Sequence, residues 1–175
     1  MQKLIEGVHK FQQDEFGNYR KLFKKLSREG QNPHTLFITC SDSRVLAELI
    51  TQSKPGDLFV VKNVGNIVPP ASSVGSTNST AAAIEFAIES LEVSDIVVCG
   101  HSQCGAMEAL LKGLPTDKPM PHLQDWLALA APVRHVLQTE YHHLKSHEEL
   151  ATAAADSRNL LIDTGYEADK NTFFK

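Results

Sequence analysis

The chain has 175 residues, of which 42% are hydrophobic and 22% charged, and its formal net charge is −4. These values are typical of one globular domain of ordinary composition. No basic cluster extends beyond Lys24 and Lys25, which argues against nucleic acid or an anionic membrane as the main partner. No stretch reaches the length of a membrane span, the first residues lack a signal-peptide core, and the odd number of cysteines argues against a disulfide framework. We therefore expect a cytoplasmic protein whose cysteines are thiols or ligands.

Two amphipathic helices are predicted at the start of the chain. Apolar residues recur at helical spacing in residues 4–11 and again in residues 19–26, and Gly30 ends the second helix. Because both helices precede the first strand, we expect their apolar faces to pack on a partner subunit.

The rest of the chain alternates between strands and helices. Strands are expected at residues 35–40, 58–61 and 95–99. This alternation predicts an α/β fold with a mainly parallel sheet of about four strands flanked by helices. The helices expected between and after the strands are residues 81–91, 101–112, 123–141 (with a kink or break at Pro132) and 147–161.

Two motifs at predicted strand ends carry metal-ligating side chains. Cys40 ends one strand, and His101 and Cys104 follow another. Reactive residues gather at the carboxyl ends of strands in such sheets, so the three side chains are expected to meet. A helix starting at His101 would place His101 and Cys104 on one face, and its N-terminus would lower the pKa of the Cys104 thiol. Two thiolates and an imidazole suit tetrahedral zinc with an open fourth position, which implies an activated water.

A carboxylate and a guanidinium follow the first ligand. Asp42 could reach the metal itself or accept a hydrogen bond from metal-bound water, and a bidentate pair with Arg44 would hold it ionised and away from the metal. The alternative is an ordinary Asp–Arg pair in a turn.

Other cysteine and histidine side chains are interpreted as structural. Cys99 lies in an apolar run without a spaced partner, so we expect a small core residue and not a ligand. The downstream histidines follow no strand end and are expected at the surface; they are His122, His135, His142, His143 and His147.

The segments Cys40-Ser41-Asp42-Ser43-Arg44 and His101-Ser102-Gln103-Cys104-Gly105 resemble the β-class carbonic anhydrases, most strongly the bacterial and cyanobacterial members. The resemblance implies reversible hydration of CO2 to bicarbonate and a proton by zinc-bound hydroxide, in a homodimer or a larger homo-oligomer. It implies zinc ligation by Cys40, His101 and Cys104, a catalytic dyad of Asp42 and Arg44, and a substrate pocket of Gln31, Phe59 and Phe86.

The resemblance also bears on subgroup and location. The allosteric subgroup has a tryptophan three residues before the first ligand, and Phe37 stands there, which implies the plant-like, non-bicarbonate-gated type. A cyanobacterial-like member could reside in a carboxysome. A stretch of family sequence is missing after about residue 158, within what we interpret as a single domain over residues 1–175. Two alternatives are a zinc hydrolase of CS2 or COS on the same fold and a catalytically silent assembly or scaffold member.

Overall fold

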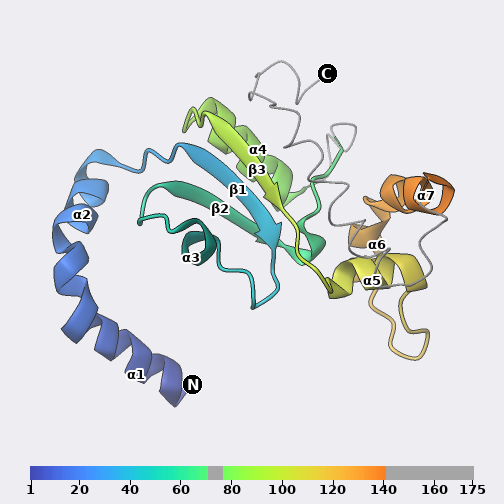
Figure 1. The fold of residues 1–175 in the computed structure, drawn as a ribbon, viewed down its shortest axis with the longest axis horizontal. Coiled ribbons are helices and arrows are strands. Elements are labelled where there is room, and N and C mark those ends of the chain that lie inside the picture. The colour runs from blue at the N-terminus through green and yellow to red at the C-terminus, as the bar shows by residue number, and fades with distance from the viewer. Residues whose placement is uncertain (71–76, 141–175) are drawn as a thin grey trace.

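The computed structural model describes residues 1–70 and 77–140 (Figure 1). No helix in these ranges is long and apolar enough to span a membrane. The elements are α1 (Gln2–Lys10), the π-helical turn η1 (Phe11–Glu15), α2 (Phe16–Glu29), β1 (Thr35–Cys40), α3 (Ala47–Thr51), β2 (Leu58–Asn63), the 3-10 turn η2 (Val64–Asn66), α4 (Ser79–Glu89), β3 (Asp95–Cys99), α5 (Gly105–Lys112), α6 (Pro121–Ala128) and α7 (Ala131–Glu140).

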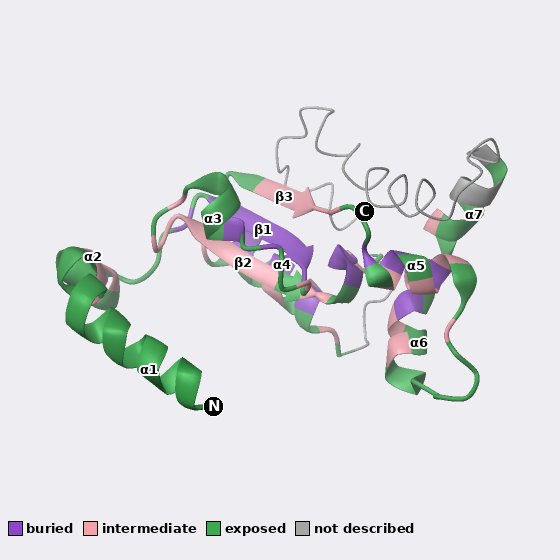
Figure 2. Ribbon diagram, turned by 60° about the horizontal axis from the view of Figure 1, so that its bottom comes forward, coloured by how far each residue is buried: buried purple, intermediate pink, exposed green. Residues whose placement is uncertain are grey.

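The three strands form a parallel sheet in the order β2-β1-β3. Thr35 of β1 pairs with Leu58 of β2 and with Asp95 of β3, so the strands begin level with one another. The central strand β1 is buried along its whole length, while β2 and β3 are mostly half-buried (Figure 2). The predicted α/β fold and all three predicted strands are confirmed, although the described residues hold three strands where about four were expected.

Helix α4 covers one face of the sheet. Leu36 and Ile38 of β1 pack there against Ile84, Ala87 and Ile88, and each of these five side chains is at most 6% exposed. Burying an aliphatic side chain of this size stabilises a fold by about 1.5–3 kcal/mol. This cluster therefore fixes the sheet from which the functional loops extend.

The helices after β3 form a second apolar cluster beside the carboxyl ends of the strands. Met107 of α5 and Leu127 of α6 are buried in it together with Cys40. The expected break near Pro132 is confirmed, because α6 ends at Ala128 and α7 begins at Ala131. Proline fits the first turn of a helix, where its missing N–H costs no bond. The helix expected at residues 147–161 lies outside the described residues.

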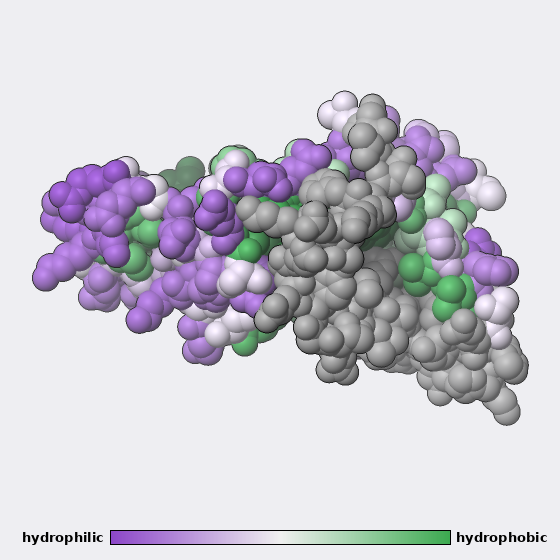
Figure 3. Space-filling view, turned by 90° about the horizontal axis from the view of Figure 1, so that it is seen from above, coloured by the Kyte–Doolittle hydropathy of each residue, from purple (hydrophilic) through white to green (hydrophobic). Residues whose placement is uncertain are grey.

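The N-terminal helices form an arm that extends away from the sheet (Figure 1). The two predicted helices are joined by η1, and Gly30, with φ of 83°, ends α2 as expected. None of the residues of α1, η1 or α2 is buried. Leu4 is 72% exposed, Ile5 51% and Val8 55%. Hydrophobic side chains accordingly show at the arm's surface between hydrophilic ones (Figure 3).

Candidate metal centre

The predicted ligands meet at the carboxyl edge of the sheet. Cys40 ends β1, and His101 and Cys104 belong to the loop after the neighbouring strand β3. The ligating atoms of the three side chains all lie within 4.8 Å of one another, and the two sulfurs are 3.9 Å apart. Tetrahedral zinc with Zn–S bonds of about 2.3 Å requires a sulfur separation of about 3.8 Å. The cysteine pair therefore has the spacing that this ion needs.

The His101 ring is oriented for ligation through Nε2. Its Nδ1 lies 2.9 Å from the carbonyl oxygen of Ser102, which can only accept, so the proton is on Nδ1. Nε2 is buried and has no hydrogen-bond partner among the residues that the structure describes. A buried nitrogen lone pair without a partner is costly unless a ligand takes it, and a bond from the other ring nitrogen to a carbonyl is how proteins orient metal-binding histidines. The donor set therefore fits a zinc ion.

Cys104 reaches the centre by a different route from the one predicted. The helix begins at Gly105 and not at His101, so Cys104 is its N-cap and no helix face presents His101. Gln103, with φ of 53°, turns the chain between the two ligands. Burial raises the pKa of the Cys104 thiol, and this outweighs the hydrogen bonds from the Met107 and Ala106 backbone that lower it. The backbone N–H groups of the helix N-terminus therefore lower the pKa of this thiol as predicted, but burial is the larger effect and the net shift is upward.

Asp42 and Arg44 form the bidentate pair that the sequence predicted. The backbone N–H and Nε of Arg44 donate to Oδ1 of Asp42, each at 2.9 Å, and Nη2 donates to Oδ2 at 2.9 Å. These hydrogen bonds and the guanidinium charge hold the pKa of Asp42 well below its usual range. The Asp42 carboxylate also lies near His101, whose Nε2 is 3.9 Å from Oδ2 of Asp42. The pair is thus not remote from the metal centre but borders it.

Two further contacts hold the loop of Asp42, and the sequence analysis missed both. Nη2 of Arg44 donates to the carbonyl of Gln103 at 3.2 Å, which joins the loops that carry the ligands. Nζ of Lys62 donates to the carbonyl oxygens of Val45 at 2.6 Å and of Asp42 at 3.2 Å. All three acceptors are backbone carbonyls, which every residue has, so no residue type could have signalled these contacts.

The structure places the three expected substrate residues away from this centre. Gln31 is exposed in the segment between α2 and β1, at the opposite end of the sheet. Phe59 pairs with Leu36, which lies about 13 Å before Cys40 along the strand. Its ring contacts that of Phe86, with centroids 5.9 Å apart, and Phe86 is 45% exposed. These residues are therefore not brought to the metal centre of their own chain.

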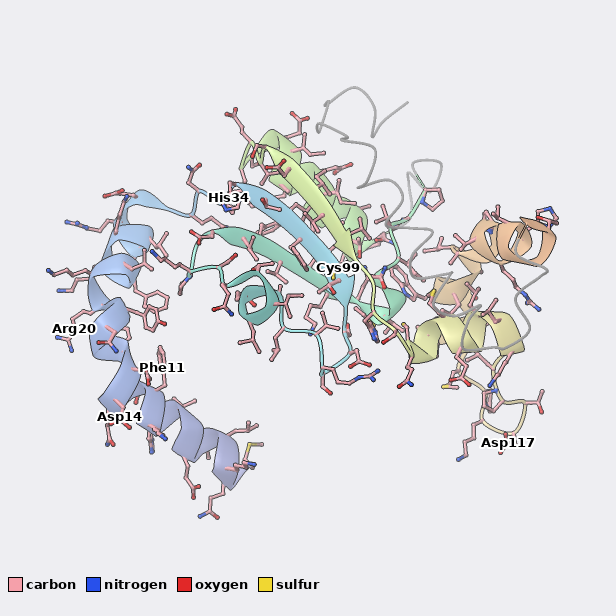
Figure 4. The ribbon with its side chains drawn as sticks, in the orientation of Figure 1. Phe11, Asp14, Arg20, His34, Cys99 and Asp117 are labelled. Atoms are coloured by element: carbon pink, nitrogen blue, oxygen red, sulfur yellow. The ribbon has the colours of Figure 1, made fainter. Side chains whose placement is uncertain are left out.

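The remaining cysteine and two of the histidines agree with the structural interpretation. Cys99 ends β3 and is half-buried, its thiol faces the carbonyl of Gly100, and it is not part of the ligand cluster (Figure 4). His122 and His135 are exposed. His142, His143 and His147 lie outside the described residues.

Comparison with known proteins identifies the family of this chain. The family model described as carbonic anhydrase matches residues 35–162. A carbonic anhydrase of a Synechocystis strain is 46% identical over 158 residues, which are 90% of this chain and 56% of that protein. This chain belongs to the carbonic anhydrase family.

Further members agree with this assignment. A carbonic anhydrase of Synechococcus elongatus is 46% identical over 81% of this chain and 51% of its own length. The chain thus spans about half the length of these curated carbonic anhydrases. Among solved structures, the β-carbonic anhydrase CcaA superposes with a TM-score of 0.83 at 45% identity, over 94% of this chain and 78% of that one. A Coccomyxa β-carbonic anhydrase in complex with acetazolamide gives 0.72 at 27%, over 88% and 65%. The Cys-His-Cys centre is accordingly a zinc site of the β-class kind.

Proposed function

We propose that this chain catalyses the reversible hydration of CO2 to bicarbonate and a proton, with zinc held by Cys40, His101 and Cys104. One observation carries the proposal: the buried Nε2 of His101, which is without a hydrogen bond in the described part of the chain, lies within 4.8 Å of the two sulfurs and beside the carboxylate of Asp42. Three protein ligands leave a fourth position of a tetrahedral ion open. The bound zinc would act there as a Lewis acid that brings the pKa of a water molecule to about 7.

The residues around the metal have separate tasks in this proposal. Asp42 is kept ionised by Arg44, so it can only accept hydrogen bonds, and it orients the attacking oxygen by accepting its proton in a hydrogen bond. Arg44 occupies both carboxylate oxygens of Asp42 and so keeps this carboxylate from ligating the metal. The carbonyl of Ser102 fixes the tautomer of His101.

We propose that the substrate pocket is completed by a second copy of the chain. Gln31, Phe59 and Phe86 do not reach the metal of their own subunit, because they lie toward the amino end of the sheet. In a two-fold symmetric dimer, these three residues of one subunit can face the metal centre of the other subunit, and the reverse holds by symmetry. Gln31 would then contact the substrate, and the two aromatic rings would supply an apolar surface for CO2.

The exposed arm supports the same assembly. Leu4, Ile5 and Val8 lie on α1 without any contact that buries them, which is the signature of an interface. A solved β-carbonic anhydrase of Sordaria macrospora, 30% identical with a TM-score of 0.66 over 94% of this chain and 83% of that one, is described as tetrameric. We propose that α1 and α2 pack on a partner in a homodimer or a larger homo-oligomer.

Subgroup and location complete the proposal. Phe37 is buried on β1 where a tryptophan would mark the allosteric subgroup, so we assign the chain to the plant-like type that bicarbonate does not gate. We also propose a cytoplasmic location, with the carboxysome as the alternative compartment. The supporting observations are that Cys40, Cys99 and Cys104 form no disulfide with one another and that the similar proteins include cyanobacterial ones.

The test measures zinc content and CO2 hydration by stopped flow on the purified full chain. The wild type should bind one zinc per chain and hydrate CO2, and acetazolamide, which the Coccomyxa structure contains, should inhibit it. Asp42→Asn should keep its zinc but lose most of the rate, because the amide is not a charged acceptor.

Assays for sulfide release from CS2 and COS run in parallel. Sulfide release without CO2 hydration would replace the proposal by a hydrolase, and a zinc-loaded chain inactive in every assay would be a silent assembly member. An Asp42→Asn variant with the wild-type rate of CO2 hydration from pH 7 to 9 would show that the Asp42–Arg44 pair only stabilises a turn and has no role in catalysis.

A further inference from the structure

The turn η2 contacts both β1, which ends at Cys40, and α5, which Cys104 caps. It directly follows β2, whose last residue, Asn63, pairs with Cys40 and accepts a hydrogen bond from the N–H of Ser41 at 2.8 Å. On its other side, Gly65 is seated on the first turn of α5. A Cβ added at Gly65 would lie 2.7 Å from Cε of Met107 and 2.9 Å from Cβ of Ala106. The turn therefore spaces β1, which ends at Cys40, from the helix that Cys104 caps.

The backbone of this turn is left-handed at two consecutive positions, which are occupied by glycine and asparagine, the residue types that adopt this conformation most readily. Gly65 has φ of 77° and Asn66 has φ of 44°, so two consecutive residues are in the left-handed region. Asn66 is fully buried, and within residues 1–70 and 77–140 neither polar atom of its carboxamide has a hydrogen-bond partner. Burying this carboxamide is unfavourable, so contacts from neighbouring elements are needed to keep the turn in place. The side chain of Asn63 provides such contacts from β2, by bonds to both backbone groups of Ile67.

A second contact that keeps the turn η2 in place comes from α6. Nε1 of Trp126 donates to the carbonyl of Val64 at 2.7 Å, across 62 positions of sequence. Trp126 packs on the same apolar cluster that contains Cys40, Cys104 and Met107. The indole N–H therefore holds the carbonyl of Val64 in place. The next residue, Gly65, packs against α5, the helix that Cys104 caps.

We propose that Trp126 is a positioning residue of the metal centre: through the carbonyl of Val64 it holds the turn that sets the separation of Cys40 and Cys104. The inference rests on the zinc site and not on the CO2 reaction proposed above. Groups behind the ligands commonly tune metal affinity, and here the tuning acts through backbone spacing.

The test compares Trp126→Phe, which keeps an aromatic ring but removes the donor, with Leu127→Ala. Leu127 is the next residue of α6 and is 5% exposed in the same cluster, so its truncation loosens the packing without touching the hydrogen bond. Zinc release into excess 4-(2-pyridylazo)resorcinol is followed by colour, and the visible spectrum of the cobalt-loaded protein reports the ligand geometry. Thermal midpoints are measured alongside.

Trp126→Phe should release zinc about three to ten times faster, the range expected for one lost hydrogen bond, and should shift the thiolate-to-cobalt bands. Leu127→Ala should lower the thermal midpoint more but leave release rate and bands near those of the wild type. The proposal is overturned if Trp126→Phe releases zinc at the wild-type rate. It is equally overturned if release in both variants simply follows the loss of thermal stability.

A second measurement needs no variant, because Trp126 is the only tryptophan of the chain. Its fluorescence in the wild type should change on chelation at the rate at which zinc leaves, since coupling between two sites is reciprocal. Emission that stays constant while zinc is removed would contradict the proposal even if Trp126→Phe failed to fold.

Discussion

The central strand and the N-terminal arm solve the burial of apolar residues in opposite ways. Every residue of β1 is buried, whereas no residue of α1, η1 or α2 is (Figure 2). The strand is covered by neighbours from the same chain, and so its carboxyl end can hold Cys40 in a fixed place. In Figure 4, Asp14 and Arg20 lie on the side of the arm that faces away from the sheet. The difference teaches that the sheet buries its apolar residues within its own chain, whereas the arm leaves its apolar residues unburied among the described residues.

The largest effect, loss of the bound zinc, is expected from substitutions of the three ligands at the carboxyl edge of the sheet. Cys40→Ser, His101→Ala and Cys104→Ser should each remove zinc, because three protein ligands leave no redundancy. Metal analysis by atomic absorption checks this, with Cys99→Ala as the matched control that keeps its zinc. Substantial zinc in one of the three variants would remove that residue from the ligand set.

A truncation in the sheet should be costly at any protein concentration. Ile38→Ala, at a residue with 0% exposure, should lower the free energy of unfolding by about 2–5 kcal/mol. Leu4→Ala, at a residue that is 72% exposed, should destabilise only at concentrations where subunits associate. Denaturant unfolding at two protein concentrations measures both. A concentration-independent loss in Leu4→Ala would mean that the arm packs on its own chain.

Polar substitutions in the arm should separate the subunits while leaving the sheet folded. The triple variant Leu4→Ser, Ile5→Ser, Val8→Ser removes the exposed apolar residues of α1, so sedimentation at micromolar concentration should show smaller species than the wild type. The control changes Lys3, Glu6 and Lys10 to serine on the same helix and should keep the wild-type assembly. An unchanged oligomer in the first variant would contradict an interface at α1.

The smallest effect is expected from the pair beside the metal. Because the pKa of Asp42 is lowered in the folded state, its contribution to stability is complete above its unfolded pKa of about 3.9 and is lost as pH falls through the folded value. Arg44→Met should therefore lower the thermal midpoint at pH 7, and the difference from the wild type should shrink toward pH 3. A difference that stays constant over this range would show that the pair does not depend on the ionised carboxylate.

Much of this molecule follows from local patterns in the sequence. The alternation of apolar strands with helical spacing determined the parallel α/β architecture. A strand such as β1 has a nearly continuous apolar sequence because both of its faces are buried. The ligand set followed from residue type and from the rule that parallel strands present their ends on one edge. The Asp42–Arg44 pair could also be predicted, because its members are two residues apart and interact within one loop.

Only the tertiary structure decided how these parts are held. It placed the start of the predicted helix at Gly105 instead of His101, and it raised the pKa of the Cys104 thiol because burial outweighs the helix N-terminus. It also placed Phe59 far from the metal of its own chain, a distance fixed by strand register. The contact from Trp126 to Val64 spans 62 positions and ends on a backbone carbonyl, which has no residue type for a pattern to detect. The sequence determines which chemical groups are present, whereas the packing of segments distant in sequence determines their spacing and ionisation.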